Sequence, residues 1–203
     1  MKIVVLKYNA GNIQSVSYAL ERLGTDFEIT DDIEKIKSAD KVIFPGVGEA
    51  STTMKYLKEK KLDEVIKNLK QPVLGICLGM QLMCKFSEEN NTRCLGIFDE
   101  TVKQFTPTKE NKVPHMGWNN LTLTNDWPDQ SAENNSVYFV HSYYVPVNAY
   151  TTAICNYTVP FSAAMKKDNF YAVQFHPEKS ARAGEQILKS FLDLPDTSTL
   201  KQR

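Results

Sequence analysis

Short runs of apolar residues alternate with amphipathic segments along the first half of the chain. The apolar runs predict buried strands, which cover residues 3–6, 27–30, 41–44 and 73–76. Apolar side chains at helical spacing predict the intervening helices, at 13–23, at a short segment capped by Asp31 or Asp32, and at about 50–69. Uniformly apolar strands joined by helices are typical of a parallel sheet that is covered on both faces.

The pattern changes in the second half, where strand-like runs are separated by Pro, Asn and Asp turns. These runs cover residues 98–105, 121–124, 137–140, 152–157, 162–165 and 170–175. Residues 166–169 have the composition of a hairpin turn, so this half is expected to be antiparallel or mixed. An amphipathic helix is predicted at 181–192, followed by a frayed polar tail from about residue 195. The sequence thus predicts an α/β fold in a single domain, 1–203, with a largely parallel sheet and an antiparallel C-terminal extension.

Composition narrows the classes of function that this chain can have. Lysine and arginine balance aspartate and glutamate at 24 each, so no basic field favours nucleic acid. The four cysteines form no Cys-x-x-Cys pair and only three histidines are present, so neither a zinc cluster nor a disulfide framework is expected. No stretch approaches the roughly 20 apolar residues of a membrane span. We expect a cytoplasmic protein that acts on a small uncharged or zwitterionic substrate or binds a protein partner.

The stretch from residue 71 to 83 contains the most reactive candidate in the chain. A short apolar run ends in Gly75-Ile76-Cys77-Leu78-Gly79 and then becomes helical. A strand, a sharp turn and a helix in this order form a nucleophile elbow, and a helix N-terminus favours the reactive thiolate form of cysteine. The alternative is a buried cysteine in an ordinary turn, since Gly-x-Cys-x-Gly also occurs by chance.

A thiol nucleophile needs a base and a group that orients the base. His176 ends an apolar run and is followed by Pro177 and Glu178, which places an imidazole and a carboxylate at the carboxyl edge of the sheet, where Cys77 is also expected. His115 and His141 have no carboxylate two or three residues away, so we rank them below His176 and expect structural roles. A structural strand-end histidine is the alternative for His176 itself.

Two loops offer backbone amides for an oxyanion. The Leu78 N–H lies at the predicted helix N-terminus, and Gly46-Val47-Gly48 follows a neighbouring strand. A strand-ending turn is the other interpretation of this glycine-rich loop. Neither Gly-x-x-x-x-Gly-Lys-Ser/Thr nor Gly-x-Gly-x-x-Gly opens onto a helix, so a nucleotide cofactor is not expected.

The motifs at 45–48, 75–81 and 175–180 together resemble class I (triad) glutamine amidotransferases. The blocks at 8–12, 114–119 and 138–143 resemble more closely the glutaminase subunits of imidazole glycerol phosphate synthases, the HisH family. The six blocks span residues 8–180 in the family's order. The resemblance implies a flavodoxin-like fold, hydrolysis of L-glutamine through a cysteine thioester, and no cofactor or metal.

The resemblance also implies roles for individual residues. The implied set has Cys77, His176 and Glu178 as the catalytic triad, Val47 and Leu78 as oxyanion donors, and Gln81, Ser142 and Tyr143 as substrate-binding residues. Without the family, Gln81 would be an unremarked polar residue on a helix.

The family's ammonia is consumed by a (β/α)8-barrel cyclase, so the resemblance implies a heterodimer in histidine biosynthesis. The implied interface residues are Asn12, Trp118, Tyr138 and Lys179. Their other interpretations are a helix cap, a core aromatic, a strand aromatic and a solvated charge. We expect low glutaminase activity without the partner, because the amide in Gly46-Val47-Gly48 can rest turned away.

One position departs from the family. Lys7 stands where an aspartate is common, and a reversed charge beside a docking loop can change the partner. The sequence therefore leaves open a paralogue that supplies ammonia for amination of a surface sugar. A stand-alone γ-glutamyl hydrolase and a non-catalytic binding module of the same fold are further alternatives.

Overall fold

The computed structural model describes residues 1–8, 12–133 and 135–195. Residues 9–11 of the block at 8–12 and nearly all of the predicted C-terminal tail therefore lie outside the described residues. Within them, no helix combines the length and apolar character that a membrane span requires. The same part of the chain contains no group of three or more His, Cys, Asp and Glu side chains placed to hold a metal ion.

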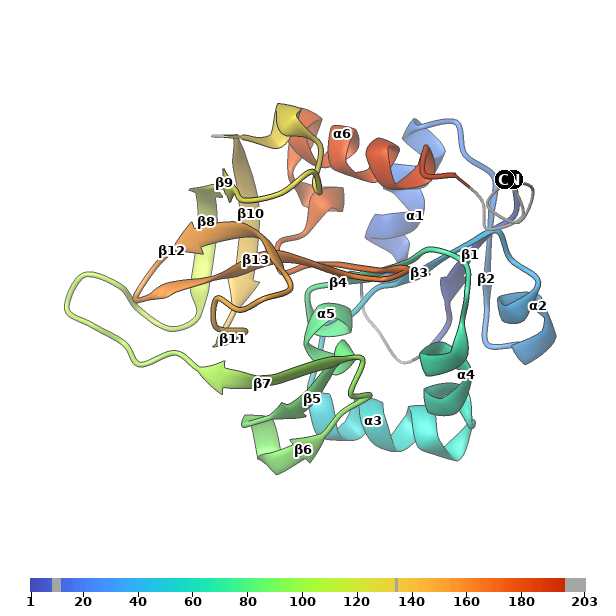
Figure 1. Cartoon of the computed structure of the whole chain (residues 1–203), viewed down its shortest axis with the longest axis horizontal. Helices are drawn as coiled ribbons and strands as arrows, with labels where there is room; N and C mark the ends of the chain where they lie inside the picture. The colour runs from blue at the N-terminus through green and yellow to red at the C-terminus, as the bar shows by residue number, and fades with distance from the viewer. Residues whose placement is uncertain (9–11, 134, 196–203) are drawn as a thin grey trace.

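An eight-stranded mixed sheet forms the centre of the molecule (Figure 1). Its strands, in spatial order, are β2 (Phe27–Thr30), β1 (Ile3–Leu6), β3 (Lys41–Phe44), β4 (Val73–Ile76), β14 (Phe170–Val173), β13 (Pro160–Lys167), β12 (Thr151–Asn156) and β9 (Thr122–Leu123). The first five run parallel, and the last three are antiparallel to their neighbours. This arrangement confirms the predicted parallel sheet with an antiparallel extension. The hairpin turn at 166–169 is also confirmed, and Asp168 has a positive φ of 51° there.

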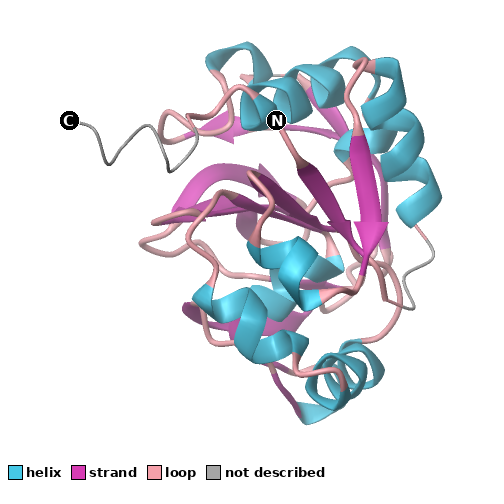
Figure 2. Ribbon diagram, turned by 90° about the vertical axis from the view of Figure 1, so that its right-hand side faces the viewer, coloured by secondary structure: helices cyan, strands magenta, loops and turns pink. Residues whose placement is uncertain are grey.

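Helices cover both faces of the sheet (Figures 1 and 2). One hydrophobic cluster joins the sheet to α1 (Ile13–Arg22) and α6 (Ala181–Leu192). The other joins it to α2 (Ile33–Lys37), α3 (Ala50–Glu59), α4 (Leu62–Asn68) and α5 (Leu78–Met83). In β1, Ile3 and Val5 belong to the first cluster and Val4 and Leu6 to the second, because alternate side chains of a strand point to opposite faces. This explains why β1 is apolar at every position.

Two further small sheets surround the carboxyl edge. One pairs β8 (His115–Asn120) with β10 (Ser136–His141), and the other has the order β11 (Tyr143–Tyr144), β7 (Phe98–Gln104), β5 (Cys84–Ser87) and β6 (Thr92–Arg93). Single 3-10 turns occur at Glu89–Asn91, Gln130–Ala132 and Pro177–Lys179. Strands β5, β6, β8 and β11 were not predicted. The partners of β8 and β11 lie farther along the chain, in β10 and β7, whereas β5 and β6 are short strands that pair locally with each other.

The predicted helix at 50–69 is two helices in the structure. Helix α3 ends at Glu59, and Lys61 adopts a left-handed conformation with φ 58° before α4 begins. The break lets Leu62 and Ile66 of α4 enter the same core as Leu57 of α3. Helical periodicity alone does not show such a break, because the pattern resumes after one turn.

Candidate active site

Cys77 occupies a strained turn between β4 and α5. It is the residue before the helix and has φ 52° and ψ −107°, a conformation that residues with a side chain rarely adopt. The glycines on either side are required by close packing. A Cβ on Gly79 would lie 2.1 Å from the Phe44 carbonyl oxygen, and one on Gly75 would lie 2.9 Å from the sulfur of Met83. This is the geometry of a nucleophile elbow.

The sheet register brings the segment after β14 beside Cys77. Strand β14 runs parallel to β4, with Val173 opposite Ile76, and the Cys77 N–H donates to the Val173 carbonyl at 2.8 Å. The chain that leaves β14 therefore passes the cysteine and carries His176 to the same edge of the sheet. This follows from the rule that functional groups in such folds gather beyond the carboxyl ends of parallel strands.

His176, Glu178 and Asn12 form a buried hydrogen-bonded row. The Nδ1 atom of His176 lies 2.8 Å from Oε1 of Glu178, and the Asn12 side-chain amide donates to the same Oε1 at 3.2 Å. Nδ1 therefore carries a proton, because a carboxylate oxygen can only accept. The other ring nitrogen, Nε2, is buried and makes no hydrogen bond of ordinary geometry within the part of the chain that the structure describes, which leaves it available to the thiol.

The electrostatics of His176 favour a charged imidazole. Burial alone would lower its pKa, but the negative charge of an ionised Cys77 and the hydrogen bond to Glu178 together raise the pKa above its usual range. A cysteine beside a protonated histidine is stabilised as the thiolate. The arrangement thus favours an imidazolium at His176, with Glu178 behind it and Cys77 in front of it.

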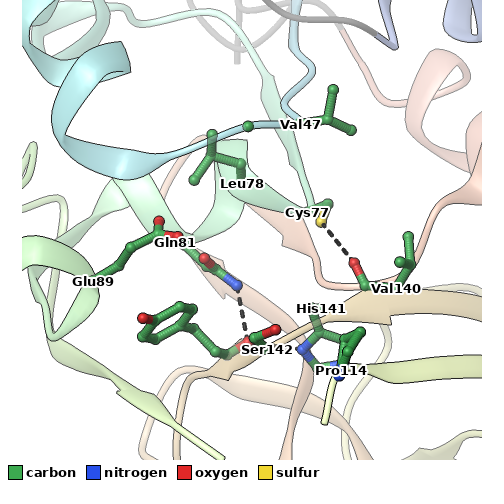
Figure 3. Close-up of a pocket in the computed structure, with 11 residues that line it drawn as sticks. Val47, Cys77, Leu78, Gln81, Glu89, Pro114, Val140, His141 and Ser142 are labelled. Atoms are coloured by element: carbon green, nitrogen blue, oxygen red, sulfur yellow. Dashed lines mark hydrogen bonds between the residues drawn. The ribbon is translucent and has the colours of Figure 1, made fainter.

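A pocket of about 370 Å³ opens over the cysteine (Figure 3). Its lining residues are Val47, Gly48, Cys77, Leu78, Gln81, Glu89, Pro114, Val140, His141, Ser142 and Tyr143. All three residues predicted to bind substrate, and both predicted oxyanion donors, are in this set. The Gln81 side-chain amide donates to the Tyr143 carbonyl at 2.9 Å, so these two residues are held together across the pocket.

The two predicted oxyanion donors are not both free in this conformation. The Leu78 N–H donates to the Gly46 carbonyl at 3.3 Å. The Val47 N–H belongs to the same peptide unit as that carbonyl, and in a trans peptide the two point in opposite directions. The N–H of Val47 is therefore turned away from Leu78, and an oxyanion would have to replace the Gly46 carbonyl.

His115 and His141 form a neutral pair at the pocket wall, where His141 is a lining residue. The Tyr143 carbonyl lies 2.7 Å from His141 Nδ1 and can only accept, so the proton is on Nδ1, and Nε2 accepts from His115 Nδ1 at 3.0 Å. Burial lowers the pKa of His141 to about 3 and that of His115 to about 4. A histidine that stays neutral and already uses both nitrogens suits a structural role.

Two residues of the site, Gln174 and Glu89, were not predicted from the sequence. Gln174 is fully buried and its side-chain amide donates to the Cys77 sulfur at 3.6 Å. It stands two residues before His176, on the segment that follows β14, and this nearness to His176 in sequence was a signal of its place in the site. Glu89 brings a carboxylate to the pocket wall from a 3-10 turn, with burial raising its pKa, and no sequence motif marked it.

The four predicted partner-facing residues lie in different environments. Trp118 is 55% exposed and stands opposite Tyr138 in the β8–β10 register, with the two rings 6.0 Å apart. Met116, on the same face of β8, is 63% exposed, and Lys179 is also exposed. Asn12 is only 3% exposed and directs its amide to Glu178. The partner contact of all four stays a prediction.

Comparison with known proteins gives a consistent family. The family model described as glutamine amidotransferase class-I matches residues 4–194. The imidazole glycerol phosphate synthase subunit HisH of Bacteroides fragilis strain YCH46 is 64% identical over 196 residues, which is 96% of this chain and 100% of the relative. The HisH subunit of Haemophilus influenzae strain Rd is 48% identical over 195 residues, covering 95% and 98%.

Solved structures share the fold at lower identity. A crystal structure of a glutamine amidotransferase superposes with a TM-score of 0.73 at 17% identity, covering 94% of this chain and 97% of that one. The structure of PurLQS from Thermotoga maritima gives a TM-score of 0.68 at 16% identity, covering 95% and 97%.

Proposed function

The chain belongs to the class-I glutamine amidotransferase family, and within it to the HisH subunits of imidazole glycerol phosphate synthase, and on this premise we propose that it is a glutaminase that supplies ammonia to a cyclase subunit. The observation that carries the proposal is the strained Cys77 at the base of the pocket, with His176 and its partner Glu178 beside it. The names of the relatives favour the histidine pathway over the sugar-amination alternative that Lys7 left open.

The proposed reaction passes through a thioester on Cys77. The thiolate attacks the side-chain carboxamide carbon of glutamine, and the carbonyl oxygen becomes an oxyanion. The C–N bond then breaks as the His176 imidazolium gives its proton to the departing ammonia. His176 next takes a proton from water, whose oxygen attacks the thioester, and the C–S bond breaks to release glutamate and restore the thiolate. Glu178 holds the imidazole in the required tautomer throughout.

The pocket provides polar groups for the amino-acid end of the substrate. Gln81 uses its side-chain nitrogen on protein acceptors, and among the described residues its side-chain oxygen makes no hydrogen bond, so this oxygen is free to accept from the substrate's ammonium. We assign the same ligand to the Glu89 carboxylate, which lines the pocket. The backbone of Ser142 and Tyr143 holds the chain of the substrate between these groups and Cys77.

Ammonia released into water at neutral pH is mostly protonated and no longer nucleophilic, so a partner must receive it directly. The exposed face of the β8–β10 sheet, with Met116 and Trp118, offers an apolar surface for such a partner. We propose that a (β/α)8-barrel cyclase docks on this face and forms a heterodimer. Lys179, on the neighbouring 3-10 turn, would lie at the edge of the contact.

The closed oxyanion site supports low activity in the free subunit. With the Gly46 carbonyl on the Leu78 N–H, turnover requires rotation of the Gly46–Val47 peptide unit. Partner docking can act on the segment that carries His176 through a short path, because the backbone of Tyr138 accepts a hydrogen bond from the His176 N–H at 2.9 Å and its N–H donates to the Ser180 hydroxyl at 2.9 Å. The partner-facing strand is thus bonded directly to the triad segment.

The test compares glutamate and ammonia release by the free subunit and by the complex with its cyclase. We expect glutamine turnover to rise by about 10²–10³ in the complex, the effect of one restored oxyanion donor. Cys77→Ala is expected to abolish glutamine turnover in the complex while synthesis from added ammonium salt continues. Full glutaminase activity without the cyclase would instead support a stand-alone γ-glutamyl hydrolase. Failure of a glutamine-analogue diazoketone to label Cys77 in the complex would support a non-catalytic binding module.

A further inference from the structure

A row of side-chain amides runs from the pocket wall to the nucleophile. The Gln81 side-chain nitrogen donates to the Tyr143 carbonyl at 2.9 Å and to the side-chain oxygen of Gln174 at 3.0 Å. The Gln174 side-chain nitrogen donates in turn to the Cys77 sulfur at 3.6 Å. Gln174 is 0% exposed, so this amide has no access to water.

The direction of the row is fixed at its far end. The Tyr143 carbonyl can only accept, so Gln81 must present its nitrogen there, and the second N–H of that nitrogen requires an acceptor on Gln174. Gln174 must therefore present its oxygen to Gln81 and its nitrogen to Cys77. Turning the Gln174 amide over would set two donors against each other at Gln81 and leave an oxygen facing the sulfur. The polarity thus follows from the network and does not depend on an arbitrary choice of amide orientation.

The row distinguishes the two ionisation states of the cysteine. As a thiol, Cys77 can donate to the Val140 carbonyl, which lies 4.0 Å from the sulfur. As a thiolate it can only accept, and the Gln174 N–H is the donor beside it. A buried donor aimed at a developing negative charge stabilises that charge without any reorganisation of solvent.

We propose that Gln174 is a second stabilising group of the nucleophile, which holds the ionised sulfur of Cys77 opposite His176, and that Gln81 fixes its orientation. His176 supplies the positive charge and the route for the proton, whereas Gln174 supplies a neutral donor that stays in place when the imidazole is deprotonated. Thiolate is therefore retained for attack and accepted again as leaving group when the thioester is hydrolysed. The inference concerns the site of the proposed glutaminase, but its chemistry at the thiol requires no particular substrate.

The test measures the pH dependence of Cys77 alkylation by iodoacetamide in the folded, free subunit, followed by mass spectrometry of the Cys77 peptide. Gln174→Met keeps the volume of the side chain but cannot donate, and we expect the midpoint of alkylation to rise by about one pH unit, which is a tenfold fall in the ionisation constant of the thiol. Gln174→Glu is isosteric and places a negative charge beside the sulfur, so the midpoint of alkylation should rise at least as far. This variant is the alternative test if Gln174→Met does not fold. The matched control is Gln71→Met. Gln71 is also buried, but its side-chain amide donates to the Ile36 carbonyl in α2.

A second comparison tests the role of Gln81. Gln81→Met should raise the midpoint by less than Gln174→Met, and the double variant should equal Gln174→Met alone, because Gln81 acts through Gln174. Midpoints unchanged within about 0.2 pH units in both Gln174 variants, or a shift of equal size in Gln71→Met, would overturn the proposal. The alkylation assay contains neither glutamine nor cyclase, so its result can be interpreted even if the proposed glutaminase function is wrong. Likewise, an unchanged alkylation midpoint would leave the proposed glutaminase function standing.

Discussion

Replacing Glu178 by glutamine separates the charge of the triad carboxylate from its geometry. In the structure, one oxygen of Glu178 accepts from both His176 Nδ1, at 2.8 Å, and the Asn12 amide, at 3.2 Å. The side-chain oxygen of a glutamine can occupy the same place and accept both bonds, because two donors face it. Glu178→Gln should therefore keep the tautomer and orientation of His176 and remove only the negative charge behind the ring.

The size of the effect follows from the burial of the pair. The side chains of His176 and Glu178 are both 0% exposed, so solvent does not screen the interaction. A hydrogen bond to a charged group contributes about 1.5–3 kcal/mol, compared with about 1 kcal/mol for a neutral one. The loss of about 1–2 kcal/mol corresponds to a roughly 5- to 30-fold fall in kcat for glutamine. The pKa of His176 should fall toward its ordinary value at the same time, because one of the groups that raise it is gone.

The assay is glutamate release by the complex with its cyclase, measured across pH, with KM determined alongside kcat. We expect KM to change little, since Glu178 lies behind the imidazole and does not line the pocket. Glu178→Ala is the comparison, because it removes both the charge and the acceptor and should lower kcat further. If Glu178→Gln retained kcat within about twofold and the pH profile did not move, the carboxylate charge would have no part in the proposed mechanism.

Three further predictions concern the surroundings of the site. Gly46→Ala should destabilise the fold by about 1–3 kcal/mol in urea unfolding, because the new Cβ would lie 2.7 Å from the backbone nitrogen of Gly79, and an unchanged midpoint would show that the loop relaxes freely. Acid should weaken the fold through the neutral pair of His141 and His115, whose folded pKa values lie below the ordinary value, so the unfolded chain binds more protons as pH falls. His141 alone should cost about 1.5 kcal/mol between pH 6.5 and pH 5, and a flat unfolding free energy over that range would contradict it. Asn12→Ala should lower kcat by about 3- to 10-fold with little change in KM, because it removes one donor to the triad carboxylate, and an effect confined to cyclase affinity would instead mark Asn12 as an interface residue.

Local sequence determined the parallel part of the fold and marked the candidate nucleophile. Buried strands such as residues 3–6 and 73–76 are uniformly apolar because both faces are covered, and the structure places them where the pattern predicts. The predicted helix at 181–192 agrees with α6 at both ends. Cys77 was recognisable because a strained elbow needs small residues on either side. Gly75 and Gly79 meet this requirement within five consecutive residues. His176 and Glu178 were recognisable from their place after a strand.

The tertiary structure decided everything that depends on residues far apart in the chain. The Gly46 carbonyl on the Leu78 N–H, the Asn12 amide on Glu178 and the Gln174 amide on the Cys77 sulfur are contacts across 32, 166 and 97 positions. No local periodicity encodes such contacts, because which polar groups meet is set by sheet register and helix packing after the chain has folded. The same reason explains the unpredicted strands β8 and β11, which pair with β10 and β7. The sequence thus determined which side chains are candidates for the chemistry, and the fold decided which hydrogen bonds these side chains and the nearby backbone groups make.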